Sequence, residues 1–168
     1  SNISKQVSIT TILAFGETIL IISGMLDLSN GAVLALAGLL SVSVFKMTGS
    51  LLVAFLVAII VAVICNIING LMVTKFKTPP FIATLAMMAM ARGAALLYTN
   101  GQNIYQIGEY TVFGQGSIFG VPTPIIFLIV VGLFTWYLLK HTRLGRSLYA
   151  IGGNEEAAVA SGVNINKN

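Results

Sequence analysis

Long apolar runs alternate with short polar stretches along the first part of the chain, before residue 140. A transmembrane helix needs about 20 mostly apolar residues, and four of the runs approach that length. A fifth run is shorter, and at about 1.5 Å per residue it covers about 21 Å of a hydrocarbon core about 30 Å thick. The pattern predicts an all-α polytopic transmembrane helical bundle with one broken or short helix, forming one partial transmembrane domain over residues 1–168. The expected spans are residues 7–26, 32–45 (the short one), 51–73, 81–99 and 123–139.

The segment 140–168 differs from everything before it, because it is polar. It opens with a basic cluster and then passes two glycines before a short predicted helix. Asn154 is a favourable N-cap, acids at Glu155 and Glu156 suit the first turn, and Gly162 can close the helix. A helix of about two turns is marginal alone in water, so it needs its own chain or a partner to dock on.

Polar side chains also interrupt the apolar runs. Glu17 lies near the middle of the first run, where an acid should face protein and not lipid. Asp27, Ser29 and Asn30 precede the short run in a glycine-bracketed stretch, which is typical of a transport pathway. A capped turn between two spans is the plainer interpretation of Asp27, since acids are common at helix starts.

Further polar groups lie deeper in the later spans. Asn66 and Asn69 have the spacing of one helix face, where amides either line a path or bond to a neighbouring helix. Arg92 lies inside its span, where it either pairs with an acid or backbone carbonyls, snorkels, or gates a path. The candidate residues for a translocation path or for intramembrane polar contacts are Glu17, Asp27, Ser29, Asn30, Asn66, Asn69 and Arg92.

Composition excludes most other classes of protein. The chain is 57% hydrophobic and 8% charged, whereas a soluble domain carries about 25% charged residues. The net charge of +4 is spread over loops, unlike the dense basic face of a nucleic-acid-binding protein. No phosphate-binding loop, hydrolase motif or metal-ligand spacing occurs in the sequence, so we expect no catalytic residue, cofactor or metal.

Basic residues predict the orientation in the membrane. Lys75 and Lys77 lie in one loop, and the cluster at residues 140–146 lies two spans later on the same side. The long loop 100–122 between them has no Lys or Arg. The positive-inside rule therefore places both basic loops in the cytoplasm, with Lys46 as the one misfit.

Three segments resemble one protein family in the same order along nearly the whole chain. They are ISGMLDLSNGAVLALAG (22–38), TPPFIATLAMMAMARGAALLYTNGQNI (78–104) and HTRLGRSLYAIGGNEEAAVASGV (141–163). The family is that of the permease subunits of bacterial ATP-binding-cassette importers for ribose and related monosaccharides. The resemblance implies a fragment of a longer inner-membrane permease, with further spans on both sides.

The resemblance also implies partners. Two permease subunits, a homodimer, would form the pore, two cytoplasmic ATPase subunits would drive it, and a periplasmic or lipid-anchored binding protein would deliver the sugar. A short cytoplasmic coupling helix would insert into a groove of the ATPase. The positions that match it are Gly153, Asn154, Glu155, Glu156, Ala157, Ala158 and Gly162.

Two alternatives belong to other classes. An ion-coupled secondary transporter is suggested by the broken segment at Asp27 and by Glu17 and Arg92 within spans. It would work without an ATPase. In a non-transporting membrane scaffold, the same charged residues would only hold helices together.

Overall fold

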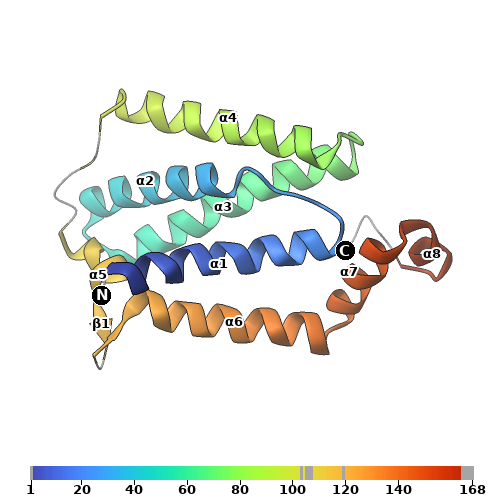
Figure 1. The fold of residues 1–168 in the computed structure, drawn as a ribbon. Helices are drawn as coiled ribbons and strands as arrows, with labels where there is room; N and C mark the ends of the chain where they lie inside the picture. The colour runs from blue at the N-terminus through green and yellow to red at the C-terminus, as the bar shows by residue number, and fades with distance from the viewer. Residues whose placement is uncertain (1, 103, 105–107, 119, 164–168) are drawn as a thin grey trace. The chain divides into compact units, whose positions relative to one another are not determined.

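The computed structural model describes residues 2–102, 104, 108–118 and 120–163. Its chain divides into two compact units, one of residues 27–111 and one of residues 1–26 with 112–168 (Figure 1). Within the described residues, five helices are long and apolar enough to cross a membrane. The prediction of an all-α polytopic bundle is therefore confirmed.

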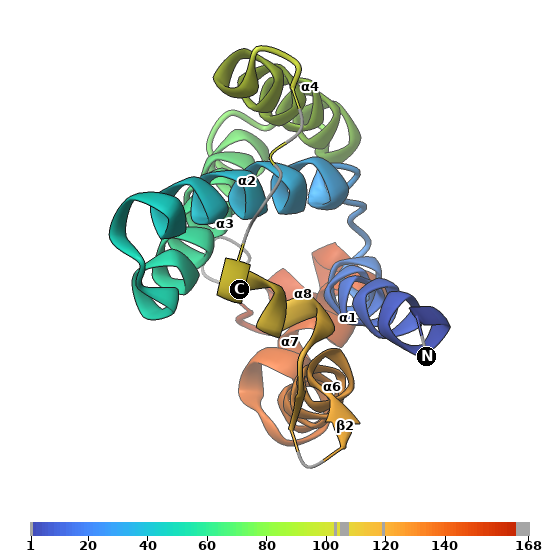
Figure 2. The ribbon, with the colours of Figure 1, turned by 90° about the vertical axis from the view of Figure 1, so that its left-hand side faces the viewer.

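The unit of residues 27–111 is built around three long helices. They are α2 (Asn30–Thr48), α3 (Leu51–Thr74) and α4 (Pro80–Thr99), followed by the short 3-10 helix η1 (Gly108–Thr111). Helix α2 packs against both α3 and α4, and it lies between them in the view turned by 90° (Figure 2). The turn from α2 to α3 is tight because Gly49 takes a left-handed conformation with φ 67°.

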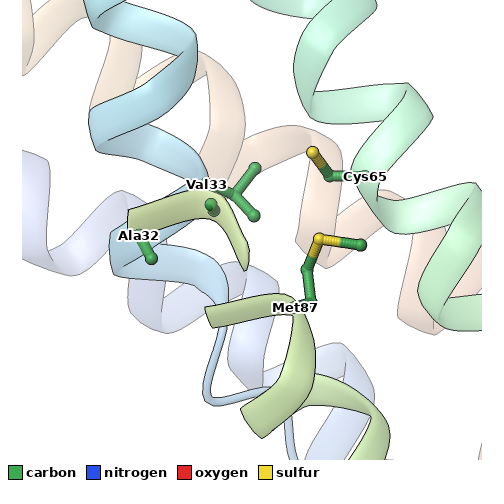
Figure 3. Packing of buried hydrophobic residues seen from close by; sticks show 5 residues of the cluster. Ala32, Val33, Cys65 and Met87 are labelled. Carbon is green, nitrogen blue, oxygen red and sulfur yellow. The ribbon is translucent and has the colours of Figure 1, made fainter. Parts of the chain in front are cut away.

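Small and flexible side chains form the core of this unit. Val33 on α2, Cys65 on α3 and Met87 on α4 converge on it (Figure 3). Ala54 and Ala83 are completely buried. Without a hydrophobic driving force between helices in lipid, small residues stabilise the contact by letting the backbones approach closely.

Helix α2 is longer than the sequence predicted. It runs over 19 residues from Asn30 to Thr48, whereas residues 32–45 were expected. The polar residues at both ends of the apolar run were assigned to loops, but they continue the helix. At about 1.5 Å per residue, α2 extends about 28 Å, close to the thickness of a hydrocarbon core.

The second unit pairs the first helix with the last long one. It comprises α1 (Asn2–Ile22), α5 (Val112–Gln115), β1 (Ser117–Ile118), β2 (Val121–Pro122), α6 (Thr123–His141), α7 (Arg143–Gly153) and α8 (Glu155–Ala160). Helices α1 and α6 lie side by side (Figure 1). A Cβ at Gly132 would be 3.2 Å from a ring carbon of Phe15, so this glycine makes room for the ring. The two short strands pair antiparallel before α6.

Many large apolar side chains remain exposed on the long helices. On α3 alone, Leu52 is 71% exposed and Ile67 is 55% exposed. Soluble proteins rarely expose so large an apolar surface to water, so lipid or further protein must surround it.

Candidate functional site

The polar segment after α6 folds into two consecutive helices, α7 and α8. Thr142 joins α6 to α7 through both functions of its hydroxyl. It donates a 2.6 Å hydrogen bond to the carbonyl of Leu138 and accepts a 3.1 Å bond from the backbone N–H of Gly145. One residue thus closes α6 and caps the start of α7.

One face of α7 is pressed against the ends of two long helices. Gly145, Leu148 and Ile151 are buried along this face. A Cβ at Gly145 would overlap the carbonyl oxygen of Leu139 at the end of α6, and a Cβ at Gly152 would overlap that of Ile22 at the end of α1. Since α7 touches the carboxyl ends of both α1 and α6, these two helices are parallel.

Helix α8 is short and is capped at both ends. The side-chain oxygen of Asn154 accepts a 3.0 Å hydrogen bond from the N–H of Ala157. At the other end Gly162 has φ +85°, and the N–H of Val163 donates to the carbonyl of Ala158 at 3.0 Å. This is a Schellman-type end, so both predicted caps are present.

The side chains of α8 differ in burial. Ala158 is 3% exposed and anchors the helix, whereas Glu155, Glu156, Ala157 and Val159 are exposed. Val159 is an apolar side chain, 53% exposed, beside two acids. The exposed face thus offers both charge and apolar area to a partner. Of the predicted coupling segment 140–168, residues 164–168 lie outside the described residues.

The sequence interpretation missed α7. It took Gly152 and Gly153 only as two glycines passed before the short predicted helix, but both residues lie in the last turn of α7. A signal was present, because Leu144, Leu148 and Ile151 follow helical spacing directly after Thr142, an N-cap residue type. Glycines close to a helix end obscured that signal, since glycine is a poor helix former.

A second candidate site is a buried polar cluster of Asp27, Ser29 and Asn69. Asp27 Oδ1 accepts hydrogen bonds from the Ser29 backbone N–H at 2.7 Å and from the Ser29 hydroxyl at 2.6 Å. The Ser29 hydroxyl accepts a 3.0 Å bond from the Asn69 amide. Asp27 is 8% exposed, Ser29 0% and Asn69 6%. The cluster therefore attaches the segment before α2 to α3.

The other predicted intramembrane polar residues are less buried than this cluster. Asn66 is exposed and donates a 2.9 Å bond to the carbonyl of Ala62 on its own helix, so it does not share the environment of Asn69. Arg92 is exposed on α4, Glu17 is partly buried on α1, and Asn30 is partly buried at the start of α2.

Aromatic and basic side chains gather at the end of α6. Lys140 Nζ lies 5.3 Å from the centre of the Trp136 ring. The His141 ring lies 5.1 Å from Trp136 and 5.5 Å from Tyr137. Such a group is typical of the membrane–water interface, where amphipathic rings and basic residues anchor a span.

Comparison with known proteins decides the family. Residues 1–168 match the family described as "Branched-chain amino acid transport system / permease component". The chain belongs to this permease family. The family is one of transport components, not of enzymes, and the five candidate spans fit a multi-pass protein of a bacterial inner membrane.

Curated relatives of this permease-family chain are sugar permeases. It is 43% identical over 169 residues to the ribose import permease protein RbsC of Bacillus subtilis (strain 168), covering 99% of this chain and 52% of the relative. It is 40% identical over 171 residues to RbsC of Escherichia coli (strain K12), covering 99% of this chain and 53% of the relative. It is 34% identical over 167 residues to the D-allose transport system permease protein AlsC of Escherichia coli (strain K12), covering 98% and 51%.

The chain therefore spans about half the length of the curated relatives it matches. No solved structure matches it. Within the described residues, no group of three or more His, Cys, Asp or Glu side chains is placed to hold a metal ion.

Proposed function

We propose that this chain is part of the membrane-spanning permease subunit of an ATP-binding-cassette importer. The importer carries a monosaccharide, with ribose as the first candidate, across a bacterial inner membrane. ATP hydrolysis takes place in a separate subunit. The substrate class is supported by relatives named for ribose and D-allose, at 34–43% identity over nearly the whole chain.

The observation that carries the proposal is the arrangement of α8 on α7. A six-residue helix is too short to be stable alone, and here both its ends are capped and one face is anchored by Ala158. The other side chains of α8, including Glu155, Glu156 and Ala157, are exposed. A short helix that is capped at both ends and exposes most of its side chains is suited to insertion into a groove of an ATPase.

The placement of basic residues supports a cytoplasmic position for α8. Helices α1 and α6 end together at α7, and Lys140, Arg143 and Arg146 lie in or beside it. In chain order α2 and α3 follow the end of α1, and two crossings return a chain to the side that it left, so we expect the loop with Lys75 and Lys77 on that same side. By the positive-inside rule that side is the cytoplasm.

The proposed assembly has further members. A second permease subunit completes the pore, two ATPase subunits bind the coupling helices, and a periplasmic or lipid-anchored binding protein delivers the sugar. We place the coupling contact on residues 153–158 and Gly162. The cluster of Asp27, Ser29 and Asn69 acts as an intramembrane polar contact. Glu17, Asn30, Asn66 and Arg92 remain candidates for the translocation path.

Purification of the full-length permease with its ATPase and binding protein tests the proposal. Ribose, D-allose and L-arabinose are screened for stimulation of ATP hydrolysis, and one of them should stimulate it. Ala157→Trp should abolish co-purification of the ATPase, because a bulky ring on the exposed face of α8 cannot enter a close-fitting groove. Ala157→Ser is the matched control and should bind normally. Normal binding and sugar-stimulated hydrolysis with Ala157→Trp would refute the coupling role of α8.

A further inference from the structure

At Gly152, helix α7 approaches α1 backbone to backbone. The Cα of Gly152 faces the Ile22 carbonyl so closely that any Cβ would overlap its oxygen, and the Cα of Ser23 would be 3.3 Å from that Cβ. A Cα–H group aimed at a carbonyl oxygen makes a weak hydrogen bond. Side-chain rotation cannot relieve an added Cβ here, because the three atoms nearest to it all belong to the backbone.

The Ile22 carbonyl that faces Gly152 lies in a well-ordered helix end. Helix α1 ends in a left-handed turn at Gly24, with φ +81°. The N–H of Met25 donates to the carbonyl of Leu20 at 2.9 Å, and that of Gly24 donates to Ile21 at 2.9 Å. This Schellman-type closure restrains the backbone on both sides of the Ile22 carbonyl.

The same helix is connected directly to α8. Only Asn154 separates α7 from α8. Its backbone N–H donates a 3.1 Å hydrogen bond to the carbonyl of Ala150 in α7, and its side chain caps α8. Force applied to α8 therefore passes into α7 without a flexible linker. At its other end α7 is held to α6 by Thr142 and Gly145.

We propose that Gly152 is a positioning residue that transmits motion of the coupling helix to α1 through its backbone contact with Ile22. The inference rests on the proposed function, since it needs an ATPase that moves α8. Movement of α8 tilts α7 about its attachment to α6 and displaces the carboxyl end of α1. Two spans of the permease, α1 and α6, then respond together to the ATPase.

Gly152→Ala in the full-length permease, assembled with its ATPase and binding protein, tests the joint. The added methyl group separates α7 from α1 but leaves the exposed face of α8 unchanged. ATPase binding should therefore remain, while sugar transported per ATP hydrolysed falls by about tenfold, within the range typical of coupling between sites. Gly16→Ala is the matched control, because Gly16 lies on α1 with nothing within 4 Å of an added Cβ. This control should transport normally.

Hydrogen exchange provides a second readout, which can be taken on the unmodified complex as well as on the variant. In the unmodified complex, nucleotide binding to the ATPase should change exchange both in α8 and at residues 20–26. In Gly152→Ala the change in α8 should persist and that at residues 20–26 should disappear. The role of Gly152 is overturned if exchange at residues 20–26 does not change in the unmodified complex, or if the variant transports a normal amount of sugar per ATP. Either result leaves the proposed function standing. Failure of the unmodified permease to bind any ATPase overturns the proposed function and this inference with it.

Discussion

The side-chain amide of Asn69 in α3 donates a 3.0 Å hydrogen bond to the hydroxyl of Ser29, 40 positions earlier in the chain. Ser29 in turn donates to Asp27 Oδ1 at 2.6 Å. Among the described residues, however, Asn69 Oδ1 is buried without a hydrogen-bond partner. The NH₂ group of the Asn69 amide is therefore hydrogen-bonded, and its oxygen is not. We expect the residues of the cluster to contribute unequally to the stability of the fold.

Ser29→Ala should destabilise the protein more than Asn69→Leu. Loss of the hydroxyl leaves the whole buried amide of Asn69 unbonded, and an orphaned buried group costs about 1–3 kcal/mol. Asn69→Leu removes the hydrogen bond but also removes the unpartnered oxygen, so its cost should be smaller. The measurement is the free energy of unfolding of the full-length protein in mixed detergent micelles.

A double-variant cycle completes this test. The protein with both Ser29→Ala and Asn69→Leu should be more stable than Ser29→Ala alone, because no unbonded amide remains. Asn66→Leu is the control for amide loss from α3, since Asn66 is exposed and bonds only to its own helix. Strictly additive effects of Ser29→Ala and Asn69→Leu would contradict the hydrogen-bond arrangement.

Asn154→Ala should weaken the docking of α8. Loss of the cap bond to the Ala157 N–H costs about 1 kcal/mol of helix stability. The helix must then be ordered on binding, so affinity for the ATPase should fall about fivefold. Asn154→Ser keeps a capping oxygen and should bind nearly as well as the unmodified protein. Equal affinities for all three proteins would show that the cap does not contribute to docking.

Trp136 should report a shallow position in the bilayer. It is the single tryptophan of this chain, it is 54% exposed, and it lies near Lys140 at the end of α6. In a protein with no other tryptophan, lipids brominated near the headgroup should quench its fluorescence more than lipids brominated near the chain end. Moving the probe by Trp136→Phe with Val130→Trp should reverse that order. Stronger quenching from the chain ends for Trp136 itself would contradict the interfacial assignment.

The helices of the bundle could be predicted because lipid imposes a simple rule. Each span needs a long apolar run, and the runs at residues 51–73 and 81–99 coincide closely with α3 and α4. Local chemistry also predicted the caps of α8, since Asn154 and Gly162 act on backbone groups a few residues away. Structural features that depend only on neighbouring residues, such as helix caps, can be predicted from a single sequence.

Features that depend on distant contacts could not be predicted. Asn66 and Asn69 have the spacing of one helix face, but only Asn69 meets Ser29, because burial depends on where the preceding segment packs. The close approach of Gly152 to Ile22 could not be predicted either, because it depends on where α1, far earlier in the chain, ends. The ends of α2 were misplaced because polar residues such as Asn30 and Lys46 can continue a helix as well as end it.

Sugar uptake into proteoliposomes tests the central claim most directly. Vesicles contain the full-length permease with its ATPase, with ATP supplied to the ATPase side and the sugar-loaded binding protein supplied to the other. Uptake should require both ATP and the ATPase and should continue when ionophores collapse all ion gradients. Uptake that needs an ion gradient and proceeds without the ATPase would contradict the account and identify a secondary transporter.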